Sequence, residues 1–209
     1  MPTTTRLYLE QGRKRVFASA LDWPGWARSG RSEGLAVDEL LAYAERYAEV
    51  AVRAGRRFPA AHRVEVVERV PGTQTTDFGA PGVPSTLDAE PLTAAVRRQQ
   101  VALMRASWTL LDAVVAAAPT TLRTGPRGGG RDRDEVVAHV LEAERAYARK
   151  LGVRHPPLRC DADVRALRDA LATCVLSGSA EGAWPPAYAV RRITWHVLDH
   201  AWEIQDRSS

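Results

Sequence analysis

The sequence predicts an α+β protein with two domains: a small β-β-β-α-β domain and, after it, a four-helix bundle. β-Prone alternation dominates the first seventy residues, whereas the last part of the chain shows helical periodicity. A segment rich in Pro, Gly and Thr separates the two patterns. We therefore expect domains at residues 1–70 and 88–209, joined by a linker at residues 71–87.

The first domain is predicted from its changes of period. Gly12 lies between the first two β-prone runs and indicates a hairpin. Residues 21–26 (Leu-Asp-Trp-Pro-Gly-Trp) form a tight connection, and residues 37–55 carry one amphipathic helix that ends at a glycine. The four predicted strands lie at residues 6–9, 16–20, 27–30 and 63–70.

The periodicity of residues 88–209 predicts four amphipathic helices. They are expected at about residues 88–118, 133–151, 161–176 and 187–206. The first helix has an apolar seam with steps of three and four residues, formed by Leu92, Val96, Gln99, Leu103, Ala106, Leu110, Ala113 and Ala117. Residues 71–87 contain three prolines, three glycines and four threonines without an apolar period, which is typical of a linker open to proteolysis.

Composition and charge exclude several classes of protein. The chain has 29 basic and 25 acidic residues, interleaved along the helices, which argues against nucleic acid as a partner. No stretch approaches the roughly 20 apolar residues of a membrane helix, and the N-terminus has no secretory signal. Cys160 and Cys174 are too far apart along the chain for a disulfide. A cytoplasmic protein without membrane association is expected.

Three histidines carry the strongest chemical signal. His196 and His200 are spaced i, i+4, which places both imidazoles on one face of the last helix. That face and the face of His139 on the second helix are apolar, so all three imidazoles are expected to point inward. Three imidazole ligands with one open position are typical of a catalytic metal site. The pattern predicts a divalent ion, zinc or nickel, bound by His139, His196 and His200.

Other interpretations of these residues stay open. Each histidine could instead be a hydrogen-bonded core residue. Glu142 and Glu203 each follow a candidate ligand by three residues and could be a fourth ligand, an orienting partner or a surface acid. Asp199 is expected to be exposed. No His-Glu-x-x-His motif is present, so a metalloprotease arrangement is not predicted.

Residues 88–209 resemble the DinB superfamily, a set of four-helix-bundle proteins related to thiol-dependent transferases. The resemblance rests on the order of His139 and the His196-x-x-x-His200 pair. The resemblance implies a divalent metal at these histidines and a low-molecular-weight thiol, such as mycothiol or bacillithiol, that is activated for transfer to a small-molecule substrate. Hydrolysis by activated water is the second possibility.

Residues 1–70 are similar to the HicB-like domain. The resemblance rests on the strand pair, on residues 21–26 before Ser-Gly-Arg-Ser at 29–32, and on the helix at 37–55. It implies a binding or dimerisation module, which allows for a homodimer. Antitoxins of that family continue into a DNA-binding module, whereas a helical bundle follows here. The alternative function is therefore a non-enzymatic regulatory or partner-binding protein.

Overall fold

The computed structural model describes residues 4–59, 63–125 and 130–208, which form a four-stranded sheet and seven α-helices. The strands are β1 (Thr4–Gln11), β2 (Val16–Ala20), β3 (Ala27–Gly30) and β4 (Arg63–Pro71). The helices are α1 (Glu33–Ala42), α2 (Ala44–Arg53), α3 (Gln74–Phe78), α4 (Ala94–Ala117), α5 (Arg133–Lys150), α6 (Asp161–Ser177) and α7 (Pro186–Ser208), with a 3₁₀-helix η1 at Thr86–Ala89. The predicted α+β class is confirmed.

The sheet follows from the predicted hairpin. β1 pairs antiparallel with β2 through a tight turn in which the Gly12 amide donates to the Arg15 carbonyl (2.9 Å). β2 pairs antiparallel with β3, and β1 pairs in parallel with β4, so the strand order is β3-β2-β1-β4. A parallel pair requires a crossover connection, and α1 and α2 supply it.

The helix expected at residues 37–55 is two helices. α1 begins earlier, at an N-cap where the Ser32 side chain accepts from the Leu35 amide, and the chain bends at Tyr43. This bend lets the Tyr43 ring pack against Trp202 and under the Arg28 guanidinium. The apolar period continues through the bend, so the periodicity alone could not show it.

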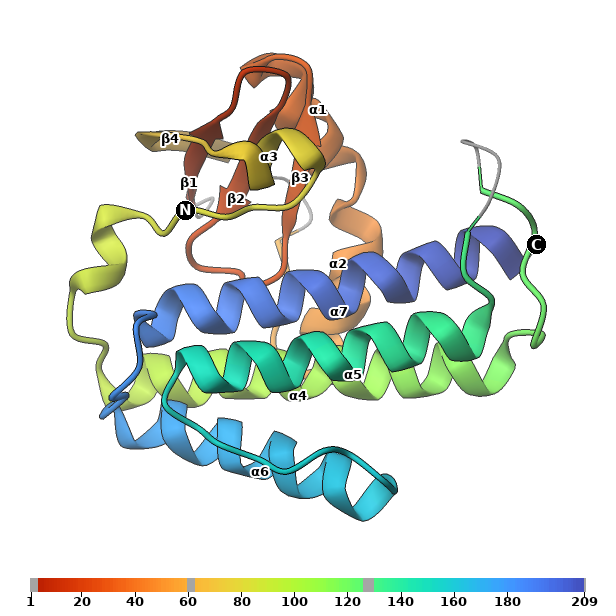
Figure 1. Cartoon of the computed structure of the whole chain (residues 1–209). Helices are drawn as coiled ribbons and strands as arrows, with labels where there is room; N and C mark the ends of the chain where they lie inside the picture. Colours follow the sequence, from red (N-terminus) through yellow and green to blue (C-terminus); the bar gives the residue numbers. More distant parts are fainter. Residues whose placement is uncertain (1–3, 60–62, 126–129, 209) are drawn as a thin grey trace.

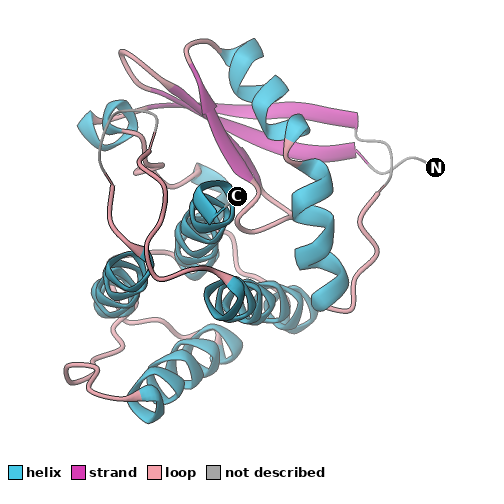
Figure 2. Cartoon of the chain, turned by 90° about the vertical axis from the view of Figure 1, so that its right-hand side faces the viewer, coloured by secondary structure: helices cyan, strands magenta, loops and turns pink. Residues whose placement is uncertain are grey.

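α7 is the central helix of the molecule. Figure 1 shows it between the sheet on one side and α4 and α5 on the other, with α6 farther from the sheet, and Figure 2 shows these helices nearly end-on beneath the sheet. From residue 187 to residue 198 every α7 side chain is buried. One hydrophobic core runs through both parts, because Leu9, Trp26 and Tyr47 belong to the same cluster as Val197 and Leu198.

The buried face of α4 differs from the predicted seam. Leu103, Ala106 and Leu110 are buried as expected. Leu92 precedes the helix, and Val96, Gln99, Ala113 and Ala117 are exposed. The reason is that α4 packs against α2, α6 and α7 together, so Gln100, Met104, Ser107, Leu111 and Val114 are buried instead.

The segment at residues 71–87 is structured and packed on the sheet. The buried carboxylate of Glu10 accepts hydrogen bonds from the Thr76 hydroxyl and from the Gly82 and Val83 amides (2.9–3.1 Å). Glu68 accepts from the Thr86 amide in the same way (3.0 Å). The segment predicted as a linker therefore contains α3 and η1. Independent folding of residues 1–70 and 88–209 stays a prediction, and the shared core means that separation would expose apolar surface of α7.

Candidate metal centre

The three predicted histidines come together between two neighbouring helices. His139 lies on α5, and His196 and His200 lie one turn apart on α7. α5 begins in a capping box formed by Asp132 and Glu135, which fixes where its turns start. Figure 1 shows α5 and α7 side by side along their lengths.

The distances between the imidazoles fit a shared ion. One ligand atom of each of the three histidines lies within 4.8 Å of the other two. Nε2 of His139 is 3.3 Å from Nε2 of His196. Two nitrogens bound tetrahedrally at zinc distances of about 2.0–2.1 Å would lie about 3.3–3.4 Å apart. The His139–His196 pair therefore already has the spacing of two zinc ligands, and a ligand atom of His200 lies within 4.8 Å of both.

Burial keeps two of these imidazoles in the neutral form that binds metal. His196 is only 6% exposed. Burial, and then the positive charges of His200 and Arg192, lower the pKa of His196 to about 2. Burial, followed by the charge of His200, also lowers the pKa of His139. Near neutral pH both rings are available as ligands without losing a proton.

Glu203 orients His200. With a proton on Nδ1, His200 donates to the Glu203 carboxylate (2.8 Å), which leaves Nε2 for a metal. Arg207 holds the other carboxylate oxygen (2.9 Å) and also donates to the carbonyls of Arg123 and Arg131 (2.7 and 2.8 Å). The hydrogen bond from His200, opposed by burial, lowers the pKa of Glu203. Glu203 is therefore an orienting partner whose carboxylate is already occupied.

The other acidic candidates lie away from the imidazoles. The Glu142 side chain is 77% exposed and contacts Arg145 at 3.6 Å. Asp199 was expected to be exposed, but it is only partly exposed and forms an ion pair with Arg28 (2.6 Å) on the sheet. Within the described ranges no fourth His, Cys, Asp or Glu joins the three-histidine group. His139 and His200 are half-buried, so the site is open to solvent on one side.

Removing the orienting carboxylate should weaken metal binding without abolishing it. We expect Glu203→Ala to lower zinc affinity by about 10–100-fold, because His200 loses the partner that fixes its tautomer and ring orientation. Competition with a chromophoric chelator measures this change. Glu142→Ala is the matched control and should leave the affinity unchanged. Equal affinities for the wild type and Glu203→Ala would contradict an orienting role.

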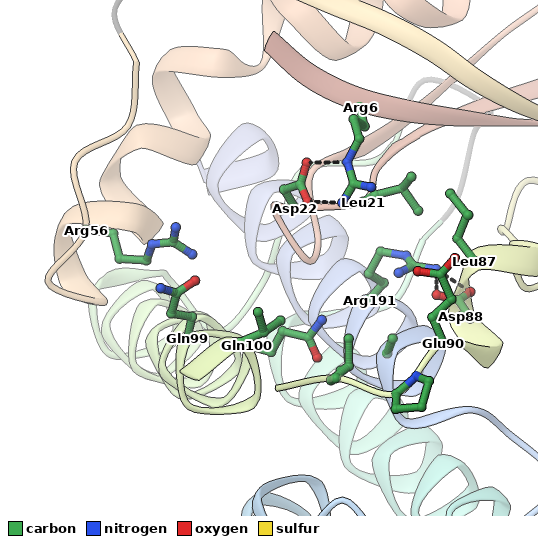
Figure 3. Close-up of a pocket in the computed structure, with 14 residues that line it drawn as sticks. Arg6, Leu21, Asp22, Arg56, Leu87, Asp88, Glu90, Gln99, Gln100 and Arg191 are labelled. Carbon is green, nitrogen blue, oxygen red and sulfur yellow. Dashed lines mark hydrogen bonds and ion pairs between the residues drawn. The ribbon is translucent and has the colours of Figure 1, made fainter. Parts of the chain in front are cut away.

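A separate polar cavity of about 330 Å³ lies between the sheet and the helices (Figure 3). Its walls carry two ion pairs, Arg6 with Asp22 (2.7 Å) and Arg191 with Asp88 (2.6 Å). These four charges are therefore satisfied within the protein. None of the three histidines lines this cavity, so it is not part of the metal centre.

Comparison with protein-family models gave no match, and comparisons with curated proteins and with solved structures gave no significant match. Among the described helices, none is both long and apolar enough to cross a membrane. Function is therefore inferred from the geometry of the site itself.

Sequence reasoning missed two arginines at the site. Arg207 anchors Glu203, and Arg192 lies one turn before His196 on α7. The i, i+4 spacing of Arg192, His196 and His200 is visible in the sequence and could have pointed to Arg192. No sequence signal shows that Arg192 is buried, because arginines on helices are mostly solvated.

Proposed function

We propose that this protein is a metal-dependent enzyme in which His139, His196 and His200 bind one divalent ion, zinc or nickel, and act on a small-molecule substrate. The observation that carries the proposal is the approach of three imidazole ligand atoms to within 4.8 Å. The resemblance of residues 88–209 to the DinB superfamily supports it. Three protein ligands leave a coordination position for a substrate.

The best specific activity is transfer or isomerisation with a low-molecular-weight thiol, and hydrolysis is second. A divalent ion at this site would lower the pKa of a coordinated thiol or water toward neutrality. The protein supplies the rest of the site. Glu203 fixes the ring of His200, burial keeps His196 neutral, and the half-buried edges of His139 and His200 leave an approach from solvent.

Elemental analysis of protein purified without a histidine tag tests the proposal. We expect about one zinc or nickel ion per chain, retained on gel filtration. Protein that stays metal-free after incubation with either ion would overturn the proposal. That outcome would favour the alternative of a non-enzymatic regulatory or partner-binding protein related to HicB-like antitoxins.

Metal affinity should decrease in acid, with a dependence set by burial. Protons compete with the metal for neutral imidazole, so affinity falls as pH falls. Because burial lowers the pKa of His139 and His196 below the usual value of about 6.5, competition at these two rings begins only at lower pH. The zinc dissociation constant, measured from pH 7.5 to pH 5, should therefore rise less steeply than three unperturbed imidazoles would require. A dissociation constant that rises as steeply as expected for three unperturbed imidazoles would contradict the prediction.

A further inference from the structure

Two side chains next to the metal centre are buried with unpaired hydrogen-bond donors. Arg192 and Trp195 are 8% and 5% exposed. The Arg192 guanidinium lies over the Trp195 ring at 4.7 Å and over the Tyr147 ring at 5.0 Å. Nη1 of Arg192 and Nε1 of Trp195 have no hydrogen-bond partner among the described residues. Both atoms are donors, so both require an acceptor.

The described residues provide no acceptor for these two atoms. An arginine cannot lose its charge in a protein, and a buried donor without a partner is costly. The Tyr147 ring lies against the Arg192 guanidinium, but it leaves Nη1 without a hydrogen-bond partner. The charge of Arg192 also acts on the buried carboxylate of Glu10, but the oxygens of that carboxylate accept from Thr76, Gly82 and Val83. An anionic group from outside the chain is the acceptor that matches both the charge and the donors.

These donors lie beside His196, one of the three histidines. The rings of Tyr147 and Trp195 lie 5.6 and 6.1 Å from the ring of His196. Arg192 precedes His196 by one helical turn, about 6 Å along α7. A molecule bound at the metal through one end could place its other end against Arg192, one turn along the same helix.

We propose that Arg192 and Trp195 form an anion subsite that holds the carboxylate of the molecule bound at the three-histidine centre. The substrate class is then a small carboxylic acid with a metal-binding group, such as a thiol, two or three carbons from the carboxylate. This inference rests on the proposed function, because it needs a metal in the site. The subsite would select substrates that carry a carboxylate, which the three histidines alone do not do.

Cobalt-loaded full-length protein tests the subsite. The probes are 3-mercaptopropionate and its neutral isostere 3-mercaptopropionamide, and the thiolate-to-cobalt absorption measures the two dissociation constants. The two probes differ in thiol acidity, but that difference is the same for every variant. A change in the ratio of their affinities between variants therefore isolates the contribution of the protein. Arg192→Met should lower the preference for the carboxylate at least about tenfold while the cobalt content stays unchanged.

Further variants separate the subsite from general effects. Arg192→Lys should keep part of the preference, and Trp195→Phe, which removes only the indole donor, should lower it a few-fold. Arg131→Gln is the matched control, because Arg131 is an exposed cation near the same histidines and its loss should leave the ratio within about twofold. If Arg192→Met does not fold, Trp195→Phe and Arg192→Lys still provide the test.

The outcomes are distinguishable. An affinity ratio that is the same in the wild type, Arg192→Lys and Trp195→Phe, with cobalt bound, would overturn the subsite alone and indicate that water satisfies the two donors. Absence of cobalt binding in the wild type would overturn the metal centre and the subsite together.

Discussion

Replacing His200 with alanine should reduce bound metal from about one ion per chain to nearly none. The two remaining imidazoles, His139 and His196, give only two protein ligands, which is too few for a zinc site of the usual kind. Glu203 would also lose one of its hydrogen-bond partners and keep Arg207. Elemental analysis after gel filtration measures the stoichiometry, and thermal unfolding with and without zinc measures the stabilisation that binding confers.

His155→Ala is the control for this experiment. His155 lies between α5 and α6, outside the two helices that carry the site, and contacts the carbonyl of Pro156 (3.0 Å). His62, the other histidine outside the predicted site, lies outside the described residues. We expect zinc to raise the melting temperature of wild type and His155→Ala equally, and to have no effect on His200→Ala. Full metal content in His200→Ala would refute the three-histidine site.

Replacing Gly25 with valine should destabilise the fold by about 3 kcal/mol or more. Gly25 has φ of +90°, and a Cβ at this position would lie 2.6 Å from Thr194 Cγ2 and 2.9 Å from Leu198 Cδ1 on α7. The substitution therefore adds backbone strain to overpacking of the core. Urea unfolding measures the loss. Thr194 and Leu198 lie on the side of α7 away from His196, so the folded fraction should still bind metal.

Gly55→Val separates the two causes. Gly55 also has a positive φ (+68°), but no atom lies within 4 Å of a Cβ built there. The free energy of unfolding of this variant should fall only by the cost of the backbone conformation, about 1–2 kcal/mol. If Gly25→Val were no more destabilising than Gly55→Val, the close approach between residues 21–26 and α7 would not contribute to stability.

Local features of the fold were predictable from the sequence because their causes are local. The hairpin at Gly12 and the last helix follow from turn residues and periodicity. The bend at Tyr43 and the buried face of α4 did not follow, because packing against several neighbours decides them. Residues 71–87 lack an apolar period, yet hydrogen bonds to the distant Glu10 and Glu68 hold them in place.

The sequence by itself determined that His196 and His200 share a face of one helix, because a spacing of four residues is one turn of any α-helix. It could also nominate His139 from the apolar face of its own helix. Only the tertiary structure decided that these rings meet, that Glu203 orients His200, and that Arg192 is buried beside His196. The physical reason is the position of α7. The sheet covers the side of this helix that a bundle alone would leave in water, and that burial turns an ordinary surface arginine into a charge that requires a partner.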